Sequence, residues 1–123
     1  MPKLTEQSRA PKLIGDFGEG LVTYALIKGG YEVAHVDHVG ADLIAEKKGA
    51  RIAVSVKTRN RNTETHESDM VVITHDNIKK LEFFASQFGG MEPVFAQVIC
   101  HAKLNCIHLF MIKVKDIKQY LIR

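Results

Sequence analysis

The chain has 123 residues, 46% of them apolar, which is enough for a single domain (residues 1–123) with one hydrophobic core. Its net charge of +3 permits contact with a polyanion but excludes a protein that coats DNA by charge alone. No apolar run approaches the roughly 20 residues of a membrane span, and the polar N-terminal segment lacks the apolar core of a signal peptide. With only two cysteines, the composition predicts a cytoplasmic protein without a membrane partner.

The first half of the chain predicts one helix followed by three strands. We expect residues 1–10 to be flexible and a helix to run from Pro11 to Lys28, ended by Gly29 and Gly30. Residues 31–39 are predicted to be extended, and residues 42–46 and 51–58 to form a β-hairpin. The apolar residues of the helix recur at helical spacing, at Ile14, Phe17, Leu21, Tyr24 and Ala25.

The second half predicts a loop, a helix, two strands and a short amphipathic end. Residues 58–69 contain no apolar side chain, which predicts a long surface loop. Thr74 or Asp76 is suited to cap a helix that ends near Phe88. Its buried stripe is predicted to be Ile78, Leu81, Ala85 and Phe88. Strands at 93–100 and 107–114 complete the order α-β-β-β-α-β-β-α.

The predicted hairpin brings an acid and an amine together. If its turn spans two or four residues, Glu46 pairs with Arg51 and Asp42 lies directly opposite Ser55. Side chains alternate along a strand, so Lys57 shares a face with Ser55 and joins the same cluster. Such a cluster suits phosphodiester hydrolysis, because a carboxylate can hold a divalent metal while a lysine orients water or stabilises developing charge.

Glu19 is a second candidate acid, in the first helix. It shares a stripe with Gly15, Val22 and Leu26, at spacings of four, three and seven residues. A carboxylate flanked by small and apolar residues is placed to line a cleft and not an open charged face. Glu19 is therefore a candidate member of the same site.

Three motifs resemble those of a known family. They are Gly-Asp-Phe-Gly-Glu at 15–19, Gly-Ala-Asp-Leu-Ile-Ala at 40–45 and Ile-Ala-Val-Ser-Val-Lys-Thr-Arg at 52–59. In order and spacing they resemble the PD-(D/E)XK nuclease superfamily, and within it the archaeal Holliday junction resolvase branch. With the predicted helix at 77–88 and the strand after it, the resemblance covers residues 12–100.

The resemblance implies an α/β, restriction-endonuclease-like fold with an αβββαβ core and a central mixed five-stranded sheet flanked by helices. It also implies a Mg²⁺ or Mn²⁺ site and cleavage of DNA, with Glu19, Asp42 and Lys57 matching the helix glutamate, the aspartate and the lysine of the family. We therefore predict an Mg²⁺-dependent endodeoxyribonuclease that is structure-specific in the manner of a junction resolvase. A homodimer is expected, because cutting two strands calls for two sites.

One position departs from the family pattern. Ser55 stands where the family carries Glu or Asp, and a neutral hydroxyl binds Mg²⁺ poorly. Some related restriction endonucleases also carry Ser-Val-Lys and take the carboxylate from the following helix, where Glu82 is the candidate here. Glu64 and Glu67 of the predicted loop are weaker candidates. The alternative function is a catalytically inactive DNA-binding or assembly module on a nuclease fold, and a third is a purely structural protein.

Other polar residues have two interpretations each. Arg59, Arg61, Lys47 and Lys48 are candidate nucleic-acid contacts or an ordinary solvated surface. Taken alone, Asp42 also fits a turn aspartate and Lys57 a cation at a sheet edge, and only their adjacency favours a site. His66 and His75 are left unassigned.

A histidine and cysteine cluster surrounds the last predicted hairpin turn, at Cys100, His101, Cys106 and His108. These residue types are zinc ligands, but their spacing does not match a zinc knuckle. Alternation directs Cys100 and His101 to opposite faces, so we predict that the cysteines are small core residues and not metal ligands.

Overall fold

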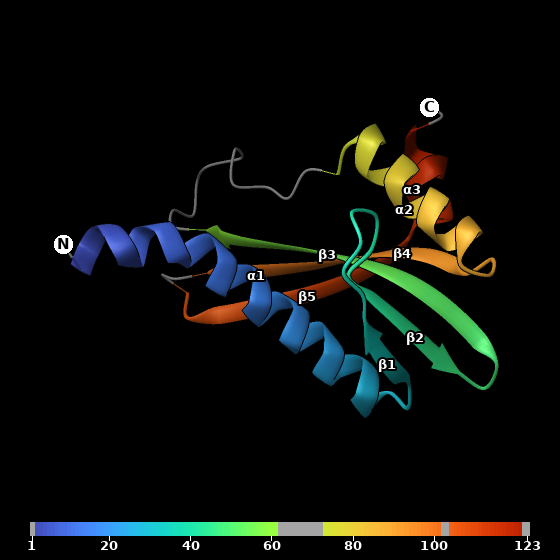
Figure 1. Ribbon diagram of the computed structural model, residues 1–123, viewed down its shortest axis with the longest axis horizontal. Coiled ribbons are helices and arrows are strands. Elements are labelled where there is room, and N and C mark those ends of the chain that lie inside the picture. Colours follow the sequence, from blue (N-terminus) through green and yellow to red (C-terminus); the bar gives the residue numbers. More distant parts are fainter. Residues whose placement is uncertain (1, 62–72, 102–103, 122–123) are drawn as a thin grey trace.

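The computed structural model describes residues 2–61, 73–101 and 104–121 and confirms the predicted element order. Figure 1 shows the arrangement of these elements. The helices are α1 (Pro2–Lys28), α2 (His75–Gln87) and α3 (Val114–Leu121). The strands are β1 (Glu32–His35), β2 (Leu43–Lys47), β3 (Ala50–Arg61), β4 (Glu92–His101) and β5 (Cys106–Lys113).

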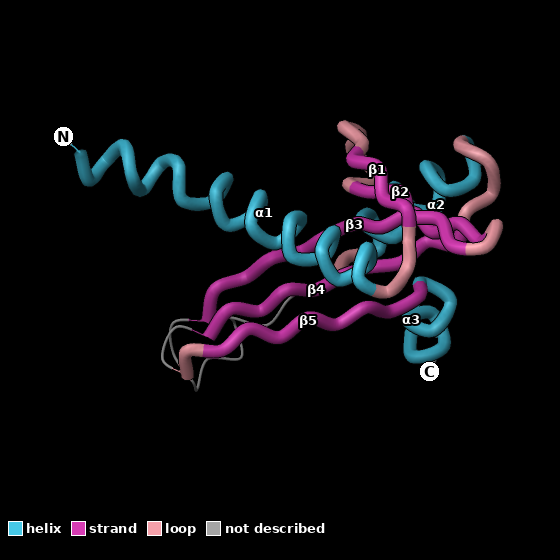
Figure 2. Tube along the Cα trace, turned by 90° about the horizontal axis from the view of Figure 1, so that it is seen from below, coloured by secondary structure: helices cyan, strands magenta, loops and turns pink. Residues whose placement is uncertain are grey.

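The strands form one mixed five-stranded sheet, as predicted, and their order in it is β1-β2-β3-β4-β5. Neighbouring strands are antiparallel except β3 and β4, which are parallel. A parallel pair needs a crossover connection, and α2 supplies it. Figure 1 shows α1 on one side of the sheet and α2 and α3 on the other, and Figure 2 shows the sheet from the α1 side. The fold is therefore an α/β sheet covered by helices on both faces.

Two hydrophobic clusters hold these layers together. On the α1 side, Val22 and Leu26 are buried against strand residues such as Leu43 and Val54. On the α2 and α3 side, the buried cluster consists of Ala41, Ala53, Ile78, Leu81, Phe84, Ala85, Met91, Phe95 and Val114. The alternation of side chains along β3 explains the division, because Ala53 and Val54 belong to opposite clusters.

The helix α1 differs from its prediction in length and in orientation. It begins at Pro2, nine residues before the predicted Pro11, because residues 2–10 are rich in Lys, Glu, Gln, Arg and Leu, which favour helix. Phe17 and Tyr24, from the predicted apolar stripe, are 46% and 61% exposed. The sheet instead contacts the face of Val22 and Gly18, where a Cβ on Gly18 would lie only 1.8 Å from Oγ1 of Thr58. Glycine at this position allows α1 to approach β3 closely.

The β2–β3 hairpin has the predicted register. Glu46 is the partner of Arg51, and Arg51 Nε lies 2.7 Å from Glu46 Oε1. Lys48 and Gly49 form the turn with positive φ angles of 52° and 83°, as a two-residue type I′ turn requires. The strand β3 runs three residues beyond the predicted Thr58, because its backbone stays paired with β4 as far as Arg61. The remainder of the predicted loop lies outside the described residues.

The helix α2 begins where it was predicted. Thr74 is its N-cap and forms a reciprocal capping box with Asn77. The buried stripe contains Phe84, whereas the predicted Phe88 is the C-cap residue and is 52% exposed. This correction follows from the end of the helix, since Phe88 no longer has helical geometry and stacks on Phe84 at a ring-centroid distance of 4.6 Å.

Candidate active site

Asp42 lies at the start of β2 and is fixed to the neighbouring β3 by two hydrogen bonds. Its backbone N–H donates to the carbonyl of Val54 at 2.8 Å, and its Oδ2 accepts from the N–H of Val56 at 2.7 Å. The regular ladder ends one pair earlier, at Leu43 and Val54, so the predicted Asp42–Ser55 pair does not form as a regular pair. The two hydrogen bonds instead join Asp42 to Val54 and Val56, the residues on either side of Ser55. They fix the Asp42 carboxylate beside β3.

Gly40 explains why the Gly-Ala-Asp motif positions this acid. A Cβ on Gly40 would lie 2.4 Å from the backbone carbonyl oxygen of Lys80 in α2. A Cβ and an oxygen that are not bonded to each other do not lie that close, so only glycine lets this segment pack on α2. Ala41, the next residue, is buried in the core beside α2. The segment that leads into Asp42 is therefore held by packing on α2 as well as by β3.

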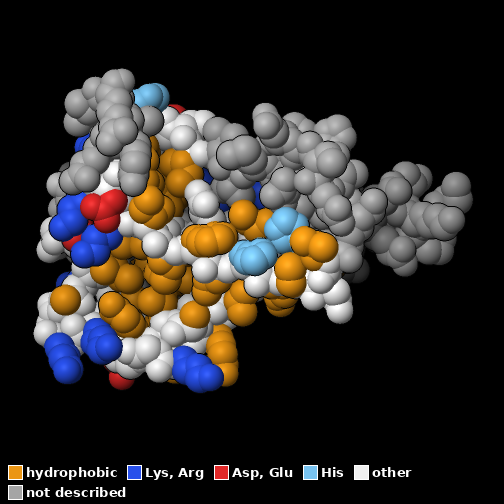
Figure 3. Space-filling model, turned by 180° about the vertical axis from the view of Figure 1, so that it is seen from behind, with side chains coloured by type: hydrophobic (Ala, Val, Ile, Leu, Met, Phe, Trp, Pro, Cys, Tyr) orange, Lys and Arg blue, Asp and Glu red, His pale blue; other side chains and the backbone are white. Residues whose placement is uncertain are grey.

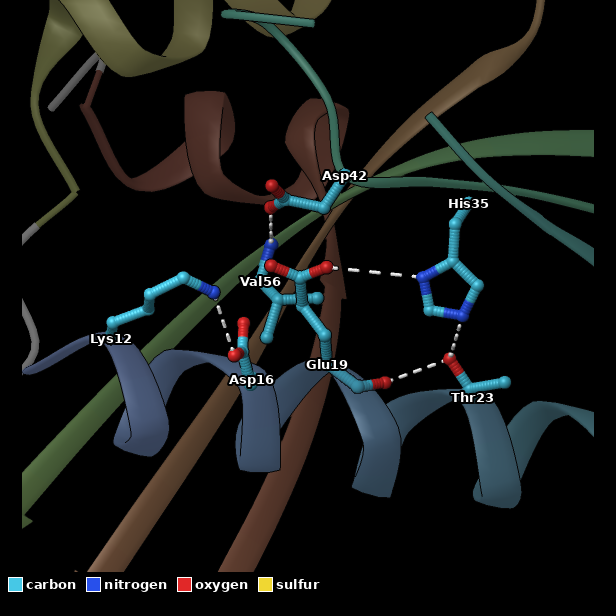
Figure 4. A network of polar contacts seen from close by, with 7 residues as sticks. All are labelled: Lys12, Asp16, Glu19, Thr23, His35, Asp42 and Val56. Atoms are coloured by element: carbon cyan, nitrogen blue, oxygen red, sulfur yellow. Dashed lines mark hydrogen bonds and ion pairs between the residues drawn. The ribbon is translucent and has the colours of Figure 1, made fainter. Parts of the chain in front are cut away.

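The carboxylate of Glu19 faces that of Asp42 (Figure 4). Glu19 reaches this point from α1, and its stripe is the predicted one, because Val22 and Leu26 are buried against the sheet. Burial raises the pKa of Glu19, and the negative charge of Asp42 raises it further. Two carboxyl groups that disfavour each other's ionisation form a place where a cation is electrostatically favoured.

Lys57 acts on Asp42 from β3. Burial raises the pKa of Asp42, while the hydrogen bond from Val56 and the positive charge of Lys57 lower it. The causes that shift the pKa of Glu19 include Asp42 but not Lys57. Asp42 therefore interacts electrostatically with both other groups of the candidate site, the carboxylate of Glu19 and the amine of Lys57.

Ser55 is buried, with 9% of its surface exposed. Its partner across β3 and β4 is Phe95, a member of the cluster on the α2 side. Alternation along β3 places Ser55 on that same side, opposite to Val54 and Val56. The serine therefore adds no charge to the site and is surrounded largely by apolar residues.

His35 is a neighbour of the site that the sequence did not indicate. Thr23 Oγ1 donates to the carbonyl of Glu19 at 2.7 Å and lies 3.3 Å from His35 Nε2. Because the single hydroxyl proton is used in this way, His35 Nε2 is the donor in the second contact. His35 Nδ1 then faces Glu19 Oε1 at 3.9 Å (Figure 4). No local pattern marks His35, because it reaches Glu19 through the packing of β1 against α1.

Glu82 is engaged elsewhere. Its Oε2 forms an ion pair with Lys118 of α3. Within the described segments, no three His, Cys, Asp or Glu side chains come together as a group that could hold a metal ion, so Glu82 does not complete a cluster with Glu19 and Asp42. Glu64, Glu67 and His66 lie outside the described residues. His75 is exposed at the first turn of α2.

The basic residues predicted to contact nucleic acid fall into two separate groups. Arg59 and Arg61 continue β3 beyond Lys57. Lys47 and Lys48 lie at the hairpin tip, and Lys47 is roughly 17 Å from Asp42 at 3.3 Å for each strand residue. Lys47 is also bound within the chain, since its Nζ donates to the carbonyl of Gly29 at 2.7 Å.

The cysteine and histidine residues near the β4–β5 turn do not form a three-ligand metal group among the described residues. Cys106 Sγ lies 3.6 Å from His108 Nε2, and both cysteines are free and partly buried. The described part of the chain also contains no helix that is both long and apolar enough to cross a membrane.

No protein-family model matches the sequence, and no curated protein matches it. The structure is similar to that of Hjc, a Holliday junction resolvase from the archaeal hyperthermophile Archaeoglobus fulgidus. That match has a TM-score of 0.58 and 20% sequence identity, and it covers 76% of this chain and 74% of that chain. This chain has the restriction-endonuclease-like fold. A bacterial homing endonuclease also matches, with a TM-score of 0.48 and 20% identity over 80% of this chain and 63% of that chain.

This likeness confirms the restriction-endonuclease-like fold that the resemblance implied. Glu19, Asp42 and Lys57 lie in the first helix, at the start of the second strand and in the third strand, the elements on which the resemblance placed them.

Proposed function

We propose that this chain is a metal-dependent endonuclease that hydrolyses DNA phosphodiester bonds at the site formed by Glu19, Asp42 and Lys57. The observation that carries the proposal is the position of Asp42, whose pKa responds to Lys57 and whose charge raises the pKa of Glu19. An acid pair beside an amine is the arrangement that phosphodiester hydrolysis uses.

The residues fit a divalent cation such as Mg²⁺ or Mn²⁺. Mg²⁺ keeps several of its waters and needs only one or two carboxylates when phosphate supplies further oxygens. Asp42 and Glu19 would hold it, and a cation there would relieve the repulsion that raises the pKa of Glu19. When bound, the metal would supply Lewis-acid chemistry at the phosphate.

Each protein group has a distinct task in this proposal. Asp42, fixed by the N–H of Val56, would hold the cation. Lys57 orients the attacking water or donates to the phosphate oxygens as negative charge develops on them. Glu19 is the accessory acid, and His35 Nδ1, 3.9 Å from its Oε1, forms an ion pair with it when the imidazole is protonated. The phosphorus–oxygen bond to the leaving group breaks as water adds.

DNA contacts are proposed on both sides of this site. Arg59 and Arg61 follow Lys57 along β3 and would bind phosphates next to the scissile bond. Lys47 and Lys48 at the hairpin tip would bind the backbone further along the duplex. The similarity of the fold to a Holliday junction resolvase makes the four-way junction the first substrate to test. A homodimer would supply the two sites that paired cuts need.

The competing proposal is a catalytically inactive DNA-binding or assembly module. Two observations favour it: the buried, neutral Ser55 in place of an acid, and the pairing of Glu82 with Lys118. Loss of one carboxylate removes negative charge where a dication must bind. Under this proposal the remaining site binds DNA but does not cut it.

Metal-dependent nicking separates the two proposals. Linear duplex, flap, mismatched and four-way-junction DNA would be incubated with the full chain and Mg²⁺ or Mn²⁺. We expect nicking that falls about 100-fold or more in Lys57→Ala, because the loss of one charge-stabilising donor has effects of that size. Lys79→Ala, an exposed lysine of α2, is the control and should cut normally. Retention of DNA without metal-dependent nicking by the wild type would instead establish the inactive module.

A further inference from the structure

The face of the sheet opposite α1 is covered over only part of its length. Phe95 of β4 and Ile112 of β5 pack in the cluster with α2 and α3. Further toward the β4–β5 turn, the next side chains on this face are Gln97, which is partly exposed, and Phe110, which is 53% exposed. Figure 1 shows β3, β4 and β5 extending beyond α2 and α3 in this direction. We call this stretch, from Gln97 and Phe110 to the turn, the open face.

Ring side chains gather on the open face. Phe110 and His108 lie on it side by side along β5, and their rings are nearly parallel, with an interplanar angle of 12° and centroids 6.0 Å apart. His101 of β4 adds a third ring, whose centroid is 5.2 Å from that of His108. Figure 3, which views the molecule from behind, shows histidine side chains among apolar side chains. Exposed rings of this kind are stacking surfaces for planar groups such as nucleic-acid bases.

Cations lie beside these rings in register. Lys57 and Arg59 of β3 share a face with Ser55, which is the side of α2 and therefore also the side of the open face. Each of the two cations begins a row of paired residues that crosses β3, β4 and β5. The rows are Lys57–Gln97–Phe110 and Arg59–Ile99–His108. Each row therefore has a cation at one end and a ring at the other.

The charge of the open face suits a polyanion. The strand segments that form it, 55–61, 95–101 and 106–112, contain no Asp or Glu. Arg59 is exposed, and its Nη1 donates to the carbonyl of Thr58 at 2.9 Å. Because a guanidinium has five N–H donors, this bond leaves others for a phosphate. A nucleic acid supplies both the phosphates that cations bind and the planar bases that rings bind.

The spacing of the rows favours a single strand over a duplex. Two residues of a β-strand span about 6.6 Å, so the rows of Lys57 and Arg59 are about that far apart. Successive bases of a duplex are about 3.4 Å apart and cover each other's faces. One nucleotide for each row therefore requires bases that are unstacked and spread, as they are in single-stranded segments.

We propose that the open face binds a single-stranded segment of DNA, whose bases stack on the rings of Phe110 and His108. The phosphates of this segment bind Lys57 and Arg59. The choice of DNA rests on the proposed nuclease function, because Lys57 belongs to both sites. The substrate class of the candidate active site is then DNA with an unpaired segment next to the scissile phosphate. Binding to the open face needs no metal, so it can be measured apart from cleavage.

Binding in the presence of EDTA tests the open face. Fluorescence anisotropy would compare a labelled single strand with a duplex of the same sequence, and the wild type should bind the single strand more tightly. Phe110→Ala should weaken binding of the single strand about tenfold, the effect of one lost stacked base, and leave duplex binding unchanged. Phe110→Trp should retain the affinity, whereas Phe110→Leu, which is apolar but has no ring, should not. His108→Ala should act in the same direction as Phe110→Ala.

Ile107→Ala is the matched control. Ile107 is 48% exposed on the same strand but on the opposite face, so this variant should bind the single strand like the wild type. Equal affinity of the wild type for single strand and duplex, or an unchanged affinity in Phe110→Ala, would overturn the proposal. Single-strand binding that depends on Phe110 but brings no metal-dependent nicking would reject the nuclease function and retain the open face as a binding site.

Discussion

The carboxylate of Glu19 in α1 faces the carboxylate of Asp42 at the start of β2, although 23 positions separate the two residues in the sequence. Burial raises the pKa of both groups, and Asp42 adds its own charge to the shift of Glu19. The fold therefore brings together two acids whose ionised forms are disfavoured without a cation. This arrangement costs stability at neutral pH, and the cost can be measured.

The pH dependence of stability should report this pair. A carboxyl whose folded-state pKa is raised stabilises the fold fully below its unfolded-state pKa, and this contribution is lost as pH rises through the folded-state pKa. Without metal, the two groups should lower the unfolding free energy as pH rises from about 4 towards neutrality. Asp42→Asn keeps an oxygen that accepts from Val56 and removes the charge, so it should be more stable than the wild type at pH 7 and little different at pH 4. Denaturant unfolding across this pH range measures the effect.

Asp76→Asn is the control for this experiment. Asp76 is an exposed carboxylate of α2, paired with Lys80 at 3.0 Å and absent from the charges that shift the pKa of Glu19 or Asp42, so its removal should bring no gain at pH 7. Mg²⁺ should stabilise the wild type and leave Asp42→Asn unchanged, because the cation favours the ionised acid. If Asp42→Asn were no more stable than the wild type at pH 7, the electrostatic account of the site would be wrong.

The sequence predicted the parts of the site that are determined locally. The turn at Lys48 and Gly49 sets the hairpin register, so the pairing of Glu46 with Arg51 could be predicted from the spacing. His35 could not be predicted, because its contact with Glu19 depends on how β1 packs against α1. Hydrophobic periodicity detects elements, but contacts between elements distant in sequence leave no local pattern.

The faces and ends of the elements were harder to predict. The helix α1 is apolar on more than one side, so periodicity alone could not show that Val22 would be buried and Phe17 exposed. Close approach at Gly18 decides between the two faces. Likewise, β3 extends through polar residues to Arg61 because β4 supplies backbone partners, and no side-chain pattern marks that extension. Tertiary packing overrides the local signal in both cases.

The contact between Gly18 and Thr58 should control the placement of Glu19. Gly18→Ala puts a methyl group 1.8 Å from Thr58 Oγ1 and 3.0 Å from Thr58 Cβ, so rotation of the threonine leaves a close contact and α1 shifts away from β3 with Glu19. We expect nicking to fall about tenfold to 100-fold, since small misplacements of catalytic groups have effects of this size. Adding Thr58→Ala removes the hydroxyl and should restore part of the activity. Equal losses in the single and double variants would exclude this steric cause.

Gly40→Ala should destabilise the whole domain. Its new methyl group would lie 2.4 Å from the carbonyl oxygen of Lys80, a backbone atom that cannot move without shifting α2. We expect a loss of about 1–3 kcal/mol in unfolding free energy, as for other overpacked positions. Gly20→Ala is the matched control, because a Cβ on Gly20 would meet no atom within 4 Å and alanine favours a helix by about 0.5–1 kcal/mol. Denaturant midpoints for the two variants should therefore move in opposite directions.

The basic residues should contribute unequally to DNA binding. Arg59 is exposed on β3 just beyond Lys57, so Arg59→Ala should weaken binding and reduce the slope of log affinity against log salt by about one, the value for one lost phosphate contact. Lys47→Ala should change the slope less, because Lys47 lies at the hairpin tip, five residues along β2 from Asp42, whereas Arg59 is two residues from Lys57. Titrations of labelled DNA at several salt concentrations give both slopes, with Lys79→Ala as the variant expected to match the wild type. An unchanged slope in Arg59→Ala would remove β3 from the DNA interface and would leave the hairpin tip as its remaining candidate.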